Sequence, residues 1–238
     1  MMKKYPLLRW KLQDFTFDWT LAKRIVQAGF PMALHQFIVS FGFGFIQRAV
    51  NSYGEAMTRS FTVAQKIETY LTLPASAFMI TQGTYTAQSI GANQLARVKT
   101  GAQATILLCE MISISLALIV FIWAKPLVAA FGLGTQAVFY CTSHLRFVAW
   151  CLPIFASYFP LLGLFQGTND ALFSTFVATM ALAIRVSSTY LLQEKWGYSM
   201  IWWNTLFGWG IGDIITWIHF LRGKWLSKTQ KEIKFFRI

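Results

Sequence analysis

The sequence predicts an all-α membrane protein with six transmembrane helices, and its composition, its charge-free segments and its turn sequences each support this class. Hydrophobic residues make up 55% of the 238 residues, whereas charged residues make up only 13%. A soluble chain of this length needs more charge to cover its surface. The composition therefore indicates a protein whose outer surface faces lipid.

Long segments without charge locate the membrane spans. A bilayer core needs about 20 apolar residues per helix, and no charged residue occurs between Glu68 and Arg97 or between Lys125 and Arg146. We expect spans at about 28–49, 62–88, 100–123, 137–163, 171–192 and 201–221. The chain then divides into a connector at 1–16, a six-helix unit at 17–225 and a basic tail at 226–238.

Turn sequences rich in glycine and asparagine separate these apolar segments, as short loops between helices require. They occur at 51–54, 91–93, 131–134, 167–170 and 196–198. An even number of spans places both termini on one side of the membrane.

The distribution of lysine and arginine predicts the orientation. Fourteen of the 21 basic residues fall on the side that holds both termini, against four on the other side. Because cytoplasmic loops carry the excess of basic residues, we expect a multi-pass plasma-membrane protein with both termini in the cytoplasm. The net charge of +12 is concentrated at the two ends, where it suits anionic lipid headgroups. No nucleic-acid motif accompanies it, so a nucleic-acid partner is not expected.

The first span is preceded by an amphipathic segment at 17–27. Its apolar residues recur near a helical period, and Asp18 is well placed to cap a helix. This pattern predicts a short interfacial helix. Gly29-Phe30-Pro31 predicts a bend where the chain enters the bilayer.

Several motifs follow one another in a recognisable order. The amphipathic segment leads to Gly29-Phe30-Pro31, and the second span contains Pro74 followed by Gln88-Ser89-Ile90-Gly91-Ala92-Asn93. A small-residue turn at 164–170 and the closing Gly223-Lys224-Trp225 come later. At this spacing the motifs together resemble the multidrug and toxic compound extrusion (MATE) family. Ser89 stands where the family usually has asparagine.

The resemblance implies a secondary antiporter that exports organic, often cationic compounds in exchange for H⁺ or Na⁺, with no cofactor besides the coupling ion. A MATE transporter has two six-helix lobes, and this chain resembles one, better the carboxy-terminal lobe. The implied partners are a small organic substrate, the lipid bilayer and either a complementary six-helix lobe or a second copy. Two alternatives stay open: a lipid-linked oligosaccharide flippase of the same superfamily, and a truncated membrane fragment that does not transport.

Charged residues within the predicted spans are the candidate functional residues, because an ion in hydrocarbon costs at least a few kcal/mol unless it is paired or hydrated. The candidates for binding the substrate or the coupling ion are Asp213, Glu68, Glu110 and Arg185. Coupling is expected at one of the three acids, since a low dielectric favours a carboxyl group that exchanges a proton for a cation. Arg185 lies at a depth similar to that of Glu68, and Arg146 is level with Glu110. Salt bridges within the lobe are therefore the structural alternative, but Asp213 has no basic residue at its depth.

Histidine and cysteine patterns predict neither a metal site nor an enzyme. The histidines lie on different spans and near no matching cysteine or carboxylate pattern, so we expect polar residues inside the bundle: His35, His144 and His219. The cysteines lack CxxC spacing and are expected to be free, inert thiols: Cys109, Cys141 and Cys151.

Small and aromatic residues in the spans carry packing hypotheses. Gly208 with Gly212, and Gly163 with Gly167, have the GxxxG spacing that allows close helix contact. The tryptophans and tyrosine around the last span have two interpretations, an interfacial belt or a pocket for lipophilic cations: Trp196, Tyr198, Trp202, Trp203, Trp209 and Trp217.

Overall fold

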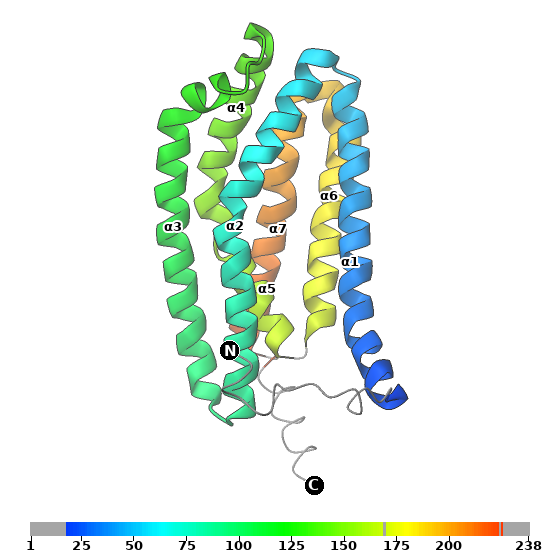
Figure 1. Ribbon diagram of the computed structural model, residues 1–238, viewed down its shortest axis with the longest axis vertical. Helices are drawn as coiled ribbons and strands as arrows, with labels where there is room; N and C mark the ends of the chain where they lie inside the picture. The colour runs from blue at the N-terminus through cyan, green and yellow to red at the C-terminus, as the bar shows by residue number, and fades with distance from the viewer. Residues whose placement is uncertain (1–17, 169, 224, 226–238) are drawn as a thin grey trace, which may run out of the picture.

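The computed structural model describes residues 18–168, 170–223 and 225, and the regular elements of these residues are all helices. The longer helices run side by side and form a bundle (Figure 1). In chain order the elements are α1 (Trp19–Asn51), α2 (Glu55–Gly91), α3 (Leu95–Ala129), α4 (Thr135–Cys151), η3 (Leu152–Phe155), α5 (Tyr158–Gly167), α6 (Ala171–Trp196), η4 (Gly197–Ser199) and α7 (Met200–Arg222). The predicted all-α class is confirmed, whereas the segments 1–16 and 226–238 lie outside the described residues.

The predicted spans coincide with these helices, with one difference. We expected residues 137–163 to form one regular helix, but the chain there forms α4, the 3₁₀ helix η3 and α5. Pro153 stands at the start of η3. Proline lacks a backbone N–H and its ring disfavours the preceding helical turn, so the fourth span is interrupted at this point.

Three stretches in the described part of the chain are long and apolar enough to cross a membrane by length and composition: Leu95–Ala129, Thr135–Phe155 and Leu172–Arg222. The third of these includes both α6 and α7. Helix α2 does not meet this criterion although it has 37 residues. Its sequence is rich in threonine, serine and glutamine, the composition of a helix that lines the interior of a bundle.

Helix α1 begins where the interfacial segment was expected. The carboxylate of Asp18 accepts a hydrogen bond of 2.8 Å from the backbone N–H of Thr20, so the predicted cap is present. The helix then continues through Pro31 to Asn51 without a break, and its first turns are tilted against the rest (Figure 1). The start of α1 and the end of α7 lie at the same end of the bundle.

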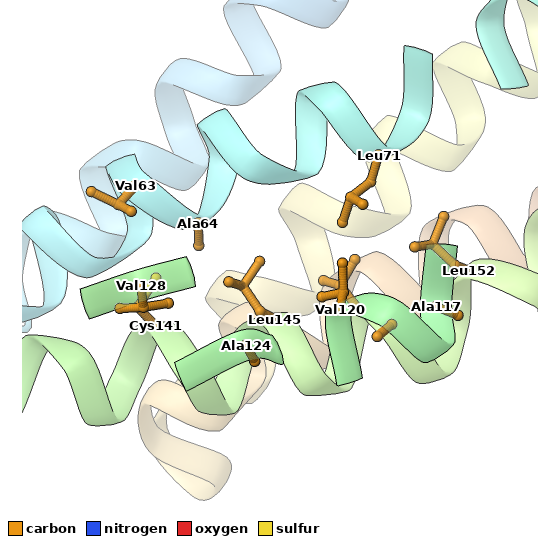
Figure 2. Close-up of a cluster of buried hydrophobic side chains, with 12 residues drawn as sticks. Val63, Ala64, Leu71, Ala117, Val120, Ala124, Val128, Cys141, Leu145 and Leu152 are labelled. Carbon is orange, nitrogen blue, oxygen red and sulfur yellow. The ribbon is translucent and has the colours of Figure 1, made fainter. Parts of the chain in front are cut away.

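The largest apolar cluster joins α2, α3 and α4 (Figure 2). Helix α3 contributes buried residues spaced three or four apart, which places them on one helical face: Ala117, Val120, Ala124 and Val128. They pack against Leu71 of α2 and Leu145 of α4, which is fully buried. This packing fixes the rotation of α2 and α4 about their axes, and with it the direction of their polar side chains.

Glycines bring α5 against α2. A Cβ at Gly163 would overlap the carbonyl oxygen of Met79, and one at Gly167 would overlap the carbonyl oxygen of Gly83. A Cβ at Gly83 would lie 3.1 Å from the carbonyl oxygen of Gly163. The two backbones therefore approach closely, as the GxxxG spacing predicts.

Candidate functional site

A cavity of about 240 Å³ lies between α1, α2 and α7. Helix α2 supplies its polar wall with residues at helical spacing: Gln65, Glu68, Thr69 and Thr72. Phe43 of α1 and Trp209 of α7 supply its aromatic walls. The cavity thus combines π faces with a single ionisable side chain, that of Glu68.

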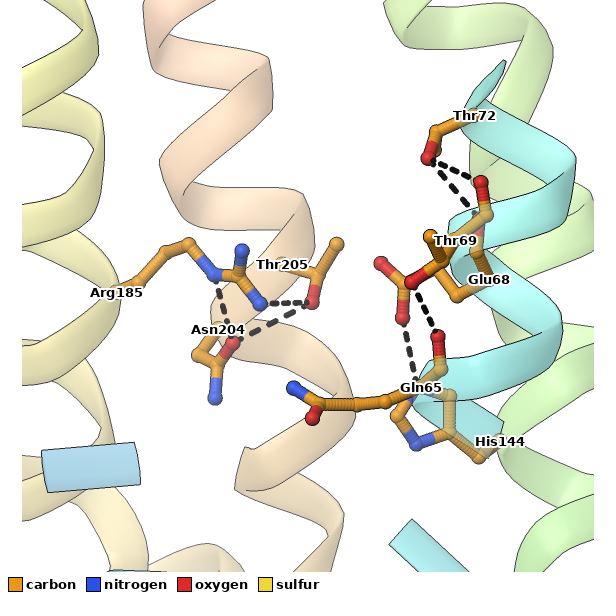
Figure 3. Close-up of polar contacts among 8 residues, drawn as sticks. All are labelled: Gln65, Glu68, Thr69, Thr72, His144, Arg185, Asn204 and Thr205. Atoms are coloured by element: carbon orange, nitrogen blue, oxygen red, sulfur yellow. Dashed lines mark hydrogen bonds and ion pairs between the residues drawn. The ribbon is translucent and has the colours of Figure 1, made fainter. Parts of the chain in front are cut away.

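The threonines of the polar wall bond to their own helix. The hydroxyl of Thr69 donates to the carbonyl oxygen of Gln65 at 2.8 Å, and that of Thr72 donates to the carbonyl oxygen of Glu68 at 3.1 Å (Figure 3). Neither hydroxyl hydrogen is directed at the Glu68 carboxylate. The carboxylate therefore keeps its capacity to accept a proton or to bind a cation.

The carboxylate of Glu68 lies beside His144 of α4. The distance from Oε2 of Glu68 to Nε2 of His144 is 3.7 Å, and the side chains are 14% and 3% exposed. The imidazole packs against the rings of Phe61 and Trp202, with centroid distances of 5.8 and 6.0 Å. The pair is ionic only when the imidazole is protonated. Two titratable groups thus meet in a space with little access to solvent.

Arg185 of α6 is buried beside the same cavity, with 5% of its surface exposed. Its Nε donates to Oδ1 of Asn204 at 3.2 Å, and its Nη2 donates to Oγ1 of Thr205 at 3.1 Å. Its guanidinium carbon lies 5.2 Å from the ring centroid of Phe43 and 5.4 Å from that of Trp209. The guanidinium is therefore held by neutral acceptors and by the two aromatic rings that line the cavity.

The salt bridge between Glu68 and Arg185 that their similar depth suggested is not formed. The two side chains point toward the same space from α2 and α6 (Figure 3), but no nitrogen–oxygen contact of 4.0 Å or less joins them. Asn204 and Thr205 of the neighbouring α7 meet the hydrogen-bonding needs of Arg185 instead. The sequence correctly placed Glu68 and Arg185 at a similar depth in the bundle. The partner of Arg185, however, depends on the rotation of α7 about its axis.

The expected pairing of Glu110 with Arg146 is also wrong. Arg146 lies over the ring of Phe121, 5.8 Å from its centroid, and makes no ion pair with Glu110 within 4.0 Å. Glu110 therefore has no ion-pair partner within 4.0 Å in the part of the chain that the structure describes.

Asp213 belongs to a second polar cluster, which does not line the cavity. Ser157 donates from its hydroxyl to Oδ1 of Asp213 at 2.9 Å, and Trp217 donates from Nε1 to the Ser157 oxygen at 2.8 Å. No basic side chain in the described ranges lies within 4.0 Å of the Asp213 carboxylate, as its depth in the sequence suggested. Its partners are neutral.

The carboxylate partners of two histidines are what the sequence interpretation missed. His144 lies beside Glu68, and Nε2 of His219 lies 3.0 Å from Oδ2 of Asp170. Both contacts join residues that are distant in the sequence. Counting depth along α2 and α4, which start at the same end of the bundle, would have placed His144 and Glu68 near each other. The side chain of His35, the third predicted histidine, lies outside the part that the structure describes.

The aromatic residues divide between the interior and the surface of the bundle. Trp209 lines the cavity and Trp202 is only 5% exposed, against His144. Trp196 and Trp203 are 45% and 36% exposed, as residues of an interfacial belt are. In the described ranges no group of three histidine, cysteine, aspartate or glutamate side chains could hold a metal ion.

Solved structures share this fold. The chain matches a MATE structure in the bent conformation with a TM-score of 0.83 and 19% identity, covering 96% of this chain and 51% of that one. It also matches a MOP superfamily transporter from Pyrococcus furiosus Vc1 (DSM3638), with a TM-score of 0.81 and 19% identity, covering 92% of this chain and 50% of that one. For that transporter, a reversed polarity of the binding pocket suggests a different function. The chain thus spans about half the length of these structures.

Curated relatives and a family profile agree with the structures. YoeA, a probable multidrug resistance protein of Bacillus subtilis (strain 168), is 22% identical over 178 residues, which are 74% of this chain and 38% of YoeA. YpnP of the same organism, also a probable multidrug resistance protein, is 23% identical over 172 residues, 71% of this chain and 39% of YpnP. The profile described as MatE matches residues 31–191, more than half of the sequence, and the chain therefore belongs to the MatE family of membrane transporters.

Proposed function

We propose that this chain is one six-helix half of a secondary antiporter that exports organic, often cationic compounds in exchange for H⁺ or Na⁺. It acts with a complementary six-helix half or with a second copy, and it corresponds to the carboxy-terminal lobe. The share of about half that it covers in the similar structures supports this division. The excess of lysine and arginine on the side of the termini supports cytoplasmic ends in the plasma membrane.

The observation that carries the proposal is the carboxylate of Glu68 in a cavity with the aromatic walls Phe43 and Trp209. In a low dielectric, a carboxylate and π faces attract an organic cation far more strongly than they do in water. The single negative charge of Glu68 neutralises one cation at a time. Binding of a proton or Na⁺ therefore competes with binding of the substrate, which is the requirement for exchange.

The depth of Glu68 supports the same conclusion. At about 1.5 Å per residue, Glu68 lies roughly 20 Å along α2 from Glu55, well inside the bundle. Binding sites of secondary transporters lie near the bilayer midplane at the interface of two repeats. A lipid-linked oligosaccharide flippase is less well supported, because it requires a strongly cationic cavity and the ionisable residue of this lining is acidic.

Ethidium efflux tests this proposal in cells that lack their own multidrug exporters. The chain is expressed together with a complementary six-helix half, as wild type, Glu68→Gln or Glu55→Gln. Glu55 is a matched control because it is an exposed glutamate on the same helix, paired with Arg59 at the helix start. We expect Glu68→Gln to abolish efflux and Glu55→Gln to retain it. Wild-type efflux by Glu68→Gln, at equal protein level, would overturn the assignment of Glu68.

A further inference from the structure

The outer surface between α3 and α4 carries two adjoining hollows with different chemistry. One has a volume of about 390 Å³ and an apolar lining that includes Ile114, Leu118, Phe121, Trp150, Pro153 and Ile154. The other, called the polar hollow here, has a volume of about 480 Å³ and a mixed lining: it includes the apolar residues Val138 and Phe139, but also Lys125, Thr142, Ser143 and Arg146. Neither hollow shares a residue with the cavity at Glu68.

The two hollows form one groove with a direction. Arg146 of the polar hollow lies over the ring of Phe121 of the apolar hollow, 5.8 Å from its centroid. Lys125 follows Phe121 by one turn of α3, and Arg146 precedes Trp150 by one turn of α4. Both cations therefore lie toward the end of the bundle where α3 ends and α4 begins. The apolar part extends from them toward the middle of the bundle.

The polar hollow lacks an anion of its own. Neither Lys125 nor Arg146 has a carboxylate within 4.0 Å among the residues that the structure describes. The hydroxyl oxygen of Thr142 is buried and has no hydrogen-bond partner there. Two cations without a carboxylate partner, at the edge of a membrane-spanning region, are stabilised by an anionic group that accepts hydrogen bonds. A phosphate has this chemistry.

The apolar hollow identifies the source of the phosphate. Its lining side chains are open to the outside of the bundle, with Trp150 72% and Leu118 59% exposed. The groove has a charged site near the end of the bundle and an apolar part that extends from it along the helices. A phospholipid has the same arrangement, with its phosphate at the membrane surface and its acyl chains directed toward the membrane interior. Free phosphate would use only the polar half.

We propose that the α3–α4 groove binds a phospholipid with an anionic headgroup, drawn from the bilayer. Its phosphate lies between Lys125 and Arg146, in the same hollow as Thr142 and Ser143. An acyl chain lies along the apolar hollow against Trp150. This site is independent of the transport cavity, so it stands or falls separately from the proposed antiport.

Native mass spectrometry of the purified chain tests the headgroup part with phosphatidylglycerol and phosphatidylcholine as probes. We expect one phosphatidylglycerol to bind more tightly than phosphatidylcholine. Lys125→Gln/Arg146→Gln should weaken it about 30-fold, from about one kcal/mol per basic residue, and leave phosphatidylcholine unchanged. The control Arg48→Gln/Arg59→Gln removes the same charge from exposed residues where α1 ends and α2 begins. Equal weakening in both double variants, or none in the first, would overturn the proposal.

Fluorescence quenching by phosphatidylglycerol with brominated acyl chains tests the position of the chain. Trp150→Phe should remove a larger share of the quenching than Trp196→Phe, whose tryptophan is 45% exposed on α6. Glycerol phosphate, which carries the headgroup charge without acyl chains, should not displace the brominated lipid at equal concentration. Equal losses in the two variants, or displacement by glycerol phosphate, would contradict a lipid held in this groove.

Discussion

Gly208 of α7 lies directly against the side-chain stem of Arg185 of α6. A Cβ at Gly208 would overlap Cγ of Arg185 and would lie 2.7 Å from the carbonyl oxygen of Ala181. The absence of a side chain at this position allows the arginine to cross α7 and reach Asn204 and Thr205. The GxxxG spacing of α7 thus serves helix packing and also positions a buried cation beside the cavity.

The first prediction concerns this contact. Gly208→Ala should lower the free energy of unfolding by about 1–3 kcal/mol, because an added methyl group in a filled space forces shifts of side chain and backbone. Gly210→Ala is the control in the same helix, since its Cβ would meet Phe155 at an ordinary 3.6 Å and alanine favours the helix. Unfolding in detergent micelles, followed by circular dichroism, checks both. A loss of stability in Gly210→Ala equal to that in Gly208→Ala would contradict the contact.

The second prediction concerns the hydrogen bonds of Arg185. Thr205→Val keeps the shape of a buried side chain but removes the acceptor for Nη2 of Arg185. A buried donor left without a partner costs about 1–3 kcal/mol, and unfolding measurements should show a loss of this size. Thr62→Val is the control, because Thr62 is exposed and its hydroxyl bonds only to the carbonyl oxygen of Thr58. If both variants were as stable as wild type, Thr205 would not hold Arg185.

The third prediction ranks the candidate acids. Glu68 lines the cavity, whereas Asp213 and Glu110 do not. Glu68→Gln should therefore lower dye efflux at least about tenfold, a change of roughly 1.4 kcal/mol, and Asp213→Asn and Glu110→Gln should have smaller effects. Asparagine at 213 still accepts the hydrogen bond of Ser157, so its effect reports charge. A larger loss of efflux in Asp213→Asn than in Glu68→Gln would place the coupling site at the cluster of Ser157 and Asp213. Unchanged efflux with all three acids neutralised would exclude coupling through any of them.

The fourth prediction concerns the thiols. The cysteines are free and buried, with exposures of 1%, 0% and 3% for Cys109, Cys141 and Cys151. N-ethylmaleimide should leave the native protein unlabelled and should add three labels after denaturation, as counted by intact mass. Ser52→Cys supplies the positive control, since residue 52 is exposed in the turn between α1 and α2. Labelling of native thiols at the rate of that control would contradict the packing.

The sequence predicted well the features that depend on position along the chain. The last span, expected at 201–221, is α7 from Met200 to Arg222, because a membrane helix requires a long and predominantly apolar segment. The interruption at Pro153 was missed, since proline inside an apolar segment is compatible with a kinked helix as well as with a break.

The candidate site was predicted less well, because it depends on rotation about helix axes. Depth counting placed Glu68 and Arg185 at one level, and both do face one space (Figure 3). The actual partners are His144 for Glu68 and Asn204 for Arg185. They depend on which face of each helix turns inward, and this is set by the apolar cluster of α2, α3 and α4 and by the glycines of α7. Sequence periodicity identifies such faces only weakly when nearly all faces are apolar.

Ion-gradient-driven transport in proteoliposomes tests the central claim most directly. Liposomes receive the chain together with a complementary six-helix half, either as wild type or with Glu68→Gln, and ethidium movement is followed after a gradient of H⁺ or Na⁺ is imposed. Ion coupling through Glu68 predicts dye movement against the ion flow with the wild-type pair, and none with Glu68→Gln. Dye movement that ignores both gradients, or that proceeds equally with Glu68→Gln, would contradict it.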